Sequence, residues 1–473
     1  MLDSVLRILL PLLVLALVAA ACSPTEEPAA TDAEATEAAP DGSVGVDSDG
    51  NAFPAPPEVP DGALAATAAQ ALDTIFDTPL ILDLDAVASL ADSGDPRVLW
   101  AISDLMRFVQ SRDEQAVLRD TAEALAGIDL GDRDFPWGLL TDHLIAWDLP
   151  DYDGYVDHKA ALFTSVEPGW APFFDDPDAT IDWRQVSWGG VFIDDRPLGD
   201  TQPCEGGCIP SLDDPPFVPA EEGAYYPDDR IVFGVVIGED VVALPRNIME
   251  VHEMVNATIG GRRVAIPYCT LCGAAQVFFT DSEGGGTDEI VMRTSGLLRR
   301  SNKVMYDLTT ESVFDTFTGH AVTGPLREMG VVLQQAPVVT STWGDWKDDH
   351  PDTMILQGNG GIGRTYPLDP LRGRDDNGPI FPVGVVDERL GVHDQVLGVV
   401  LDDGSAVAFA VLSALERLED GEEVVFDGIR VQRDAGGLTA ELDGQQLPTH
   451  QAFWFAWSQF HPETALWPHD VQD

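Results

Sequence analysis

An internal repeat constrains the fold of this chain more than any other feature of its sequence. An apolar run around Gly234 is followed by one copy of a motif, and an apolar run around Gly398 is followed by a second copy with the same spacing. The number of residues that separates the first copy from the second is about fifty smaller at the motifs than at the glycines. The pattern therefore predicts two copies of one unit, the second lacking an internal segment. The motifs are Trp343-x-x-Trp346-x-x-x-His350-Pro351-Asp352-Thr353 and Trp454-x-x-Trp457-x-x-x-His461-Pro462-Glu463-Thr464.

Both copies lie in a part of the chain with short apolar runs separated by glycine and aspartate, a pattern typical of β-strands and turns. We expect a first β-rich repeat over residues 187–365, which holds the cysteine motifs, and a shortened, cysteine-free repeat over residues 366–473. The segment expected to be unique to the first copy runs from Arg246 to Lys303. This segment is close to electrically neutral, although the chain as a whole is strongly acidic. Two explanations of this local charge balance remain open: local salt bridges, and a site tuned for an anion or a thiolate.

Upstream of the repeats the pattern changes to helical. Asp95-Pro96 is typical of a helix start, and Leu99, Ile102 and Leu105 follow at the spacing of one helical face. We expect a helical domain over residues 61–175, built from helix pairs similar to HEAT repeats. The predicted fold class is therefore α+β.

The N-terminus predicts export and anchoring. The apolar run from Ile8 to Val18 is too short to span a bilayer stably and leads into Ala19-Ala20-Ala21-Cys22, which resembles the lipobox of bacterial lipoproteins. We expect a signal peptide over residues 1–21, a lipid-modified Cys22 as the first mature residue, and a disordered tether to residue 60 that is rich in Pro, Ala, Thr and Glu. The protein would then be anchored in the cell envelope on the extracytoplasmic side; an ordinary signal peptide with an incidental cysteine is the alternative.

The charge of the chain excludes one large class of partners. Its 473 residues include 26 Lys and Arg against 81 Asp and Glu, a formal net charge of −55 at pH 7. Such a chain repels phosphate backbones, so we expect no nucleic-acid partner.

Four cysteines remain beyond Cys22, and in an oxidising compartment they allow three pairings. Local closure, Cys204 with Cys208 and Cys269 with Cys272, is the simplest. The pair at 269 and 272 is open to three interpretations: a redox-active pair, a zinc or copper site that also uses His252, or a structural disulfide. A strand-like sequence follows Cys272, which disfavours a thioredoxin arrangement. If the pair is redox-active, we expect one accessible sulfur close to Arg262, Arg263 or His252, with His252 as a proton partner.

Seven motifs follow one another along the chain: Trp188-Gly189-Gly190, Ile209-Pro210-Ser211-Leu212, His252-Glu253-x-x-Asn256, Tyr268-Cys269-x-x-Cys272-Gly273, Ser295-Gly296-Leu297-Leu298, Met305-Tyr306-Asp307 with Thr310-Glu311-Ser312, and Phe453-Trp454-Phe455-Ala456-Trp457 with His461-Pro462. Over roughly residues 130 to 470 they resemble the bacterial domain-of-unknown-function family numbered 3179. The family has no established activity; some relatives are described as possible selenoproteins, and the resemblance then implies redox chemistry at the Cys269-x-x-Cys272 position.

The sequence thus predicts a lipoprotein that performs thiol–disulfide redox chemistry at Cys269 and Cys272, with a protein redox partner. Two alternatives remain: a zinc- or copper-binding protein, and a non-catalytic binding or scaffold protein with structural disulfides. The sequence specifies no cofactor beyond the metal alternative, and no substrate.

Overall fold

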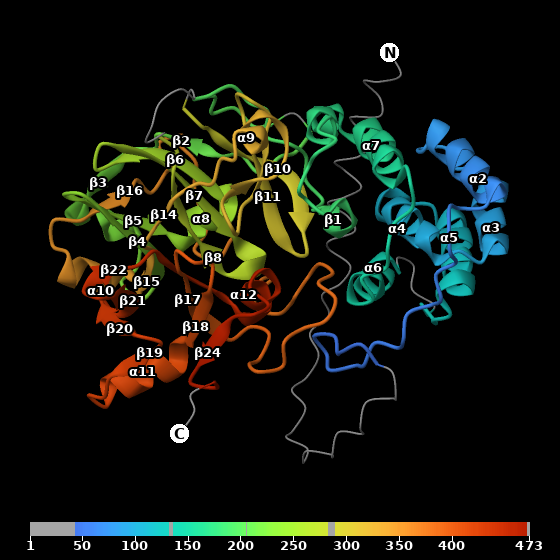
Figure 1. The fold of residues 1–473 in the computed structure, drawn as a ribbon. Helices are drawn as coiled ribbons and strands as arrows, with labels where there is room; N and C mark the ends of the chain where they lie inside the picture. Colours follow the sequence, from blue (N-terminus) through green and yellow to red (C-terminus); the bar gives the residue numbers. More distant parts are fainter. Residues whose placement is uncertain (1–42, 132–135, 205, 282–288, 471–473) are drawn as a thin grey trace.

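The computed structural model describes residues 43–131, 136–204, 206–281 and 289–470. The predicted signal peptide and Cys22 lie outside these residues. In the described part of the chain, no helix combines the length and the apolar character needed to cross a membrane. The fold is mixed, with the N-terminal helices gathered on one side and the sheets, with the later helices among them, on the other (Figure 1).

The helices nearest the N-terminus pack around one apolar core. That core continues into the sheets through Trp188, Leu297 and Tyr306, so the helices are fixed to the β part of the molecule. The predicted helix start at Asp95 is confirmed, because the Asp95 side chain accepts a hydrogen bond from the Arg97 backbone N–H at 3.1 Å. The helices are α2 (Ala66–Asp77), α3 (Leu84–Ser89), α4 (Leu99–Phe108), α5 (Arg112–Ala126), α6 (Trp137–Ala146) and α7 (Tyr155–Val166).

The predicted tether to residue 60 is wrong for its last part. Residues from 43 onward fold back on the molecule: Phe53 is buried against His143, and the Trp147 indole donates to the Pro54 carbonyl at 2.7 Å. The Val386 N–H also donates to the Val46 carbonyl at 3.1 Å, so both apolar and polar contacts hold this proline-rich stretch.

Two β units share one strand order and one set of strand directions. In each, a central antiparallel pair is extended by a further antiparallel strand on one side and a parallel strand on the other. The first unit runs β15-β4-β5-β16-β3 and the second β23-β17-β18-β24. In Figure 1, β17, β18 and β24 of the second unit lie below β4, β5 and β16 of the first. The strands are β3 (Phe217–Pro219), β4 (Ile231–Ile237), β5 (Asp240–Pro245), β15 (Val339–Thr342), β16 (Met354–Leu356), β17 (Gln395–Val400), β18 (Ala406–Ala410), β23 (Thr449–Phe453) and β24 (Ala465–Trp467).

The repeated tryptophan motifs form matching helices, α10 (Trp343–Asp349) and α12 (Trp454–Phe460). Trp346 packs on Gly234 and donates to the Thr353 hydroxyl at 2.9 Å; Trp457 packs on Gly398 and donates to Thr464 at 3.0 Å. The expectation that the two tryptophans occupy equivalent packing positions agrees with this geometry.

The first unit has more residues than the second between its second central strand and its tryptophan motif, in the direction that the repeat predicts. A short helix and antiparallel strands follow the second central strand in both units. These elements are α8 (Arg246–His252), β6 (Met254–Ile259) and β7 (Arg262–Cys269), against α11 (Val411–Glu419), β20 (Ile429–Asp434) and β21 (Gly437–Leu442).

Two further sheets have the strand orders β14-β9-β7-β6-β2, with β8 paired to β7, and β1-β10-β11-β12-β13. A third, small sheet has the order β19-β20-β21-β22 and belongs to the second unit. Their remaining elements are β1 (Val186–Trp188), β2 (Leu212–Asp213), β8 (Ala274–Ala275), β9 (Val277–Phe279), β10 (Met292–Arg299), β11 (Asn302–Asp307), β12 (Val313–Asp315), β13 (His320–Ala321), α9 (Gly324–Glu328), β14 (Gln335–Ala336), β19 (Val424–Phe426) and β22 (Gln445–Gln446).

Candidate functional site

The cysteine pair of the Cys-x-x-Cys motif occupies a tight turn between two strands. β7 ends at Cys269, a single 3₁₀ turn carries Thr270 to Cys272, and Gly273 then takes the left-handed conformation (φ +59°) before β8. A Cβ at Gly273 would lie 2.9 Å from the Phe453 ring, so only glycine suits this turn. Strands follow the motif, as the sequence predicts, and the helix of a thioredoxin arrangement is not present there.

Both sulfurs of this pair are buried and in contact. The Cys269 and Cys272 Sγ atoms lie 2.7 Å apart, and the residues are 4% and 0% exposed. The Cys272 thiol also faces two oxygen acceptors at 3.5 Å, the Ser301 carbonyl and Oδ1 of Asn302, and Cys269 Sγ lies 3.8 Å from the same carbonyl. Burial and the neighbouring Cys269 hold the pKa of the Cys272 thiol well above its ordinary value.

The predicted cationic neighbours are not beside the sulfurs. Arg262 and Arg263 begin β7, whereas Cys269 ends it, a separation of roughly 20 Å along a strand. Their guanidinium groups contact carboxylates instead: Arg262 lies 2.6 Å from Asp281, and Arg263 pairs with Asp214 and Glu289. The expectation of an accessible sulfur activated by either arginine is therefore wrong.

His252 is also held elsewhere. Its Nδ1 lies 2.6 Å from the Pro210 carbonyl and its Nε2 2.6 Å from the Tyr366 hydroxyl. Burial lowers the pKa of His252 to about 4, so the ring is neutral at pH 7. Because both nitrogens are occupied and the ring is not grouped with the two thiols, the structure supports neither the proton-partner role nor the shared metal site for this residue.

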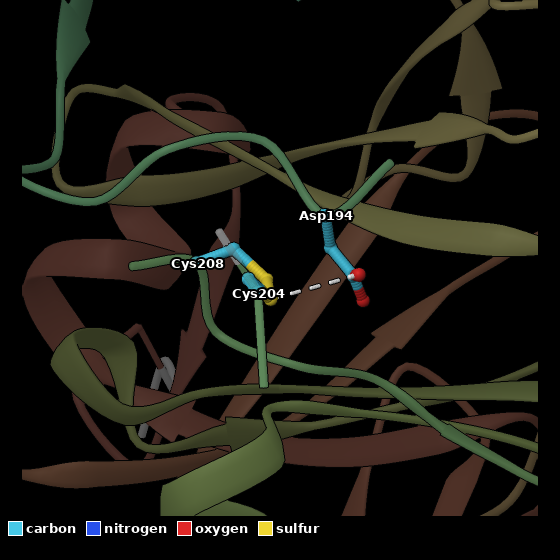
Figure 2. Close-up of side chains that lie close together, drawn as sticks. All are labelled: Asp194, Cys204 and Cys208. Atoms are coloured by element: carbon cyan, nitrogen blue, oxygen red, sulfur yellow. Dashed lines mark hydrogen bonds between the residues drawn. A yellow bond between two sulfur atoms is a disulfide. The ribbon is translucent and has the colours of Figure 1, made fainter. Parts of the chain in front are cut away.

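Cys204 and Cys208 form a disulfide, in agreement with the predicted local pairing. Figure 2 shows the pair with the buried Asp194, whose Oδ1 lies 3.9 Å from Cys204 Sγ. Within the described ranges these three residues form the one group of three ligand atoms that lie within 4.8 Å of one another. The carboxylate already contacts Arg196 at 2.6 Å and accepts from the Ser211 N–H at 2.8 Å. A disulfide next to an ion-paired carboxylate is a poor ligand set for zinc, which takes thiolates.

A cavity of about 270 Å³ lies beside the Cys269–Cys272 turn. Thr270 and Leu271, the two residues between the cysteines, form part of its wall. Six of the seven motifs that carry the family resemblance contribute residues to this cavity, although they are far apart in sequence; the motif around Trp454 does not. Its lining includes Gly189, Ile209, Glu253, Thr270, Leu271, Ser295, Gly296, Leu297, Leu298 and Met305.

The sequence missed the polar centre of the cavity wall. The Thr270 hydroxyl donates to Oε1 of Glu253 at 3.1 Å, and the Lys303 ammonium group pairs with Oε2 of the same carboxylate. Glu253 belongs to the motif that begins at His252, and Lys303 lies two residues before the motif that begins at Met305. The spacing of the two residues in the sequence does not predict their contact. The pairing of β10 with β11 and the turn after α8 bring them together, and no local sequence signal encodes that contact.

Residues 206–426 match the family described as "Protein of unknown function (DUF3179)". These residues, slightly less than half of the chain, are similar to the members of this family. The predicted resemblance is thereby confirmed; the matched region is shorter than the predicted one and contains Cys269, Cys272 and most of the cavity wall. No curated protein and no solved structure gave a significant match to the chain.

Proposed function

We propose that the DUF3179 domain is a thiol–disulfide redox protein that acts through Cys269 and Cys272. The surroundings of the two sulfurs suit both redox states, and this observation carries the proposal. Their 2.7 Å contact lets a bond form with little movement of the turn. In the reduced state, the Ser301 carbonyl and Asn302 Oδ1 can accept from the thiols. A disulfide would leave these buried oxygens without those donors, so the environment favours reduction more than a purely apolar one would.

The two cysteines differ in a way that assigns their roles. Cys269 is 4% exposed whereas Cys272 is completely buried. Burial also raises the pKa of the Cys272 thiol. Cys269 is therefore the attacking group. Its thiolate attacks one sulfur of a substrate disulfide and releases the other as a thiol; Cys272 then attacks the mixed disulfide, which leaves Cys269 and Cys272 oxidised and the substrate reduced.

A trapping experiment tests this assignment. In Cys272→Ser, the mixed disulfide of Cys269 with glutathione disulfide cannot resolve, so peptide mapping should find glutathione on Cys269. Cys269→Ser is the matched control and should trap much less. Failure of native Cys272→Ser to form the adduct, while the denatured protein forms it, would contradict the proposal.

Metal analysis of the same wild-type preparation separates the main alternative. One zinc or copper per chain, lost in either variant, would replace the redox proposal with a metal site. A metal-free pair that resists reductant in the native protein would leave a structural disulfide and favour the binding or scaffold alternative.

We infer further that the two β units descend from one duplicated unit. Their common strand order and the Gly234–Trp346 and Gly398–Trp457 contacts support this inference. The second unit has no cysteine after β21, so the proposed chemistry belongs to the first unit alone. The contact of α4 with α5 likewise supports a HEAT-type helix pair.

We also infer that the protein is exported and lipid-anchored at Cys22, on the extracytoplasmic side of the membrane. This inference rests on the apolar N-terminal run and the small residues before Cys22. A redox partner would then be another envelope protein.

A further inference from the structure

The cavity beside the cysteine turn is walled mainly by apolar side chains. They include Leu297 of β10 and Met305 of β11, together with Leu371 and Phe381 from the connection between β16 and β17. The volume of about 270 Å³ lies just below the ~300–1,000 Å³ that is typical of sites for drug-sized ligands. The cavity therefore suits a smaller molecule with an apolar body.

The connection between β16 and β17 supplies part of this wall. It runs from residue 357 to residue 394 and is built of turns. Connections of this length in a compact domain usually serve as lids or binding loops. This one is attached to α8, because the Asn247 amide donates to the Pro367 carbonyl at 3.0 Å and Arg246 pairs with Asp375. The residues between these two contacts are thereby held at the cavity.

Arg374 is a cation of the wall that no carboxylate neutralises. It is exposed, and its guanidinium has no ion pair or hydrogen bond with any residue that the structure describes. Each carboxylate of the wall, in contrast, already has a cationic partner. The pairs are Glu253–Lys303, Glu250–Arg246 and Asp375–Arg246. The Arg374 guanidinium is therefore available to an anionic ligand.

A second guanidinium without a carboxylate partner lies next to the same wall. The guanidinium carbon of Arg107 in α4 lies 5.5 Å from the centre of the Phe381 ring, and its Nε donates to the Trp188 carbonyl at 2.8 Å. Burial lowers the pKa of Arg107 to about 10, and no carboxylate of the described ranges lies within ion-pair distance to offset that burial. Two cations without partners thus lie at or beside this wall, although the whole chain has a formal net charge of −55.

We propose that this cavity binds a small aliphatic monocarboxylate, whose chain lies among the apolar side chains and whose carboxylate pairs with Arg374. A planar guanidinium can donate two parallel hydrogen bonds to one carboxylate, which gives the pair both strength and orientation. The aliphatic chain covers apolar surface of the wall, including the half-buried Leu371. The binding makes and breaks no covalent bond, so it needs neither Cys269 nor Cys272.

Calorimetric titration of the full chain at pH 7 with hexanoate, hexanol and acetate tests the proposal. Hexanoate should bind at least about tenfold more tightly than hexanol, because only the carboxylate can form the charged pair with Arg374. Hexanoate should also bind at least about tenfold more tightly than acetate, because each buried CH₂ group contributes roughly fourfold in affinity.

Three variants assign the two ends of the ligand. Arg374→Gln should weaken hexanoate binding by at least about tenfold and leave hexanol binding unchanged. Arg372→Gln is the matched control, because Arg372 is an exposed arginine of the same connection that does not line the cavity; both ligands should bind this variant as they bind the wild type. Leu371→Ala should weaken hexanoate and hexanol by a similar factor.

Equal affinities of the wild-type protein for hexanoate and hexanol would overturn the proposal, as would the absence of any binding at millimolar hexanoate. An equal loss of hexanoate binding in Arg374→Gln and Arg372→Gln would also overturn it, because the effect would then not depend on the cavity wall. None of these readouts uses the cysteines, so the result is independent of the redox proposal.

Discussion

Replacing Gly398 with alanine should destabilise the second β unit severely. A Cβ at this position would lie 1.9, 2.3 and 2.4 Å from three atoms of the Trp457 ring, whereas carbon atoms pack at about 3.5–4.0 Å. The ring would have to retreat by roughly 1.5 Å. It cannot do so easily, because Trp457 is fully buried and its Nε1 is held by the Thr464 hydroxyl at 3.0 Å.

Overpacking of a core usually costs ~1–3 kcal/mol, and a rigid, hydrogen-bonded indole places this site at the upper end, near 3 kcal/mol. Gly234→Ala should cost a similar amount, because its Cβ would lie 2.2 Å from the Trp346 ring. Gly138→Ala is the matched control: it lies within α6, no atom of the described residues comes within 4 Å of the added Cβ, and alanine should raise stability by about 0.5–1 kcal/mol there.

Urea unfolding followed by tryptophan fluorescence and near-UV circular dichroism gives the free energies of unfolding. A double-mutant cycle with Trp457→Leu, which removes the colliding ring atoms, should give a double variant less destabilised than the sum of the single variants. Equal midpoints for Gly398→Ala and Gly138→Ala, or an additive cycle, would refute the packing argument.

Three further predictions follow from the same structure and sequence. Because the folded-state pKa of His252 is about 4 against about 6.5 unfolded, its contribution to stability is complete above pH 6.5 and should fall by roughly 3 kcal/mol as the pH drops toward 4; His252→Gln should show a flatter pH profile in urea unfolding. Arg293 is fully buried and pairs with Asp213 at 2.6 Å, so Arg293→Met should cost about 3–5 kcal/mol of unfolding free energy. Arg430→Met removes an exposed ion pair with Glu423 and should leave the free energy of unfolding nearly unchanged. The mature protein should begin at a lipid-modified Cys22 and fractionate with membranes; Cys22→Ser should release it, and a mature N-terminus beyond residue 22 would refute the anchor.

The features that the sequence predicts well depend on local spacing. The two tryptophan motifs form similar short helices because the same side chains recur at the same intervals, and each indole fills the space left by a glycine in the neighbouring strand. The strands after Cys272 also follow from a local run of apolar residues.

The features that it missed depend on contacts between distant residues or on backbone geometry. The sheet that contains β6 and β7 also takes in β2, β9 and β14, which come from distant parts of the sequence, so the repeat alone could not predict this sheet. The Pro210 and Tyr366 partners of His252 come from two remote loops, and the contact of Glu253 with Lys303 depends on a left-handed residue. A histidine or lysine near a cysteine motif in sequence therefore gives no reliable position in space.

The redox equilibrium of Cys269 and Cys272 tests the central claim most directly. Native wild-type protein is equilibrated in dithiothreitol buffers of graded potential, quenched with acid and alkylated, and the reduced fraction of each cysteine pair is read by peptide mapping. The oxygens of Ser301 and Asn302 beside the sulfurs predict that this pair titrates reversibly at a potential less negative than about −300 mV, the range below which structural disulfides typically lie. A pair that stays oxidised at more negative potentials until the protein unfolds would contradict the account.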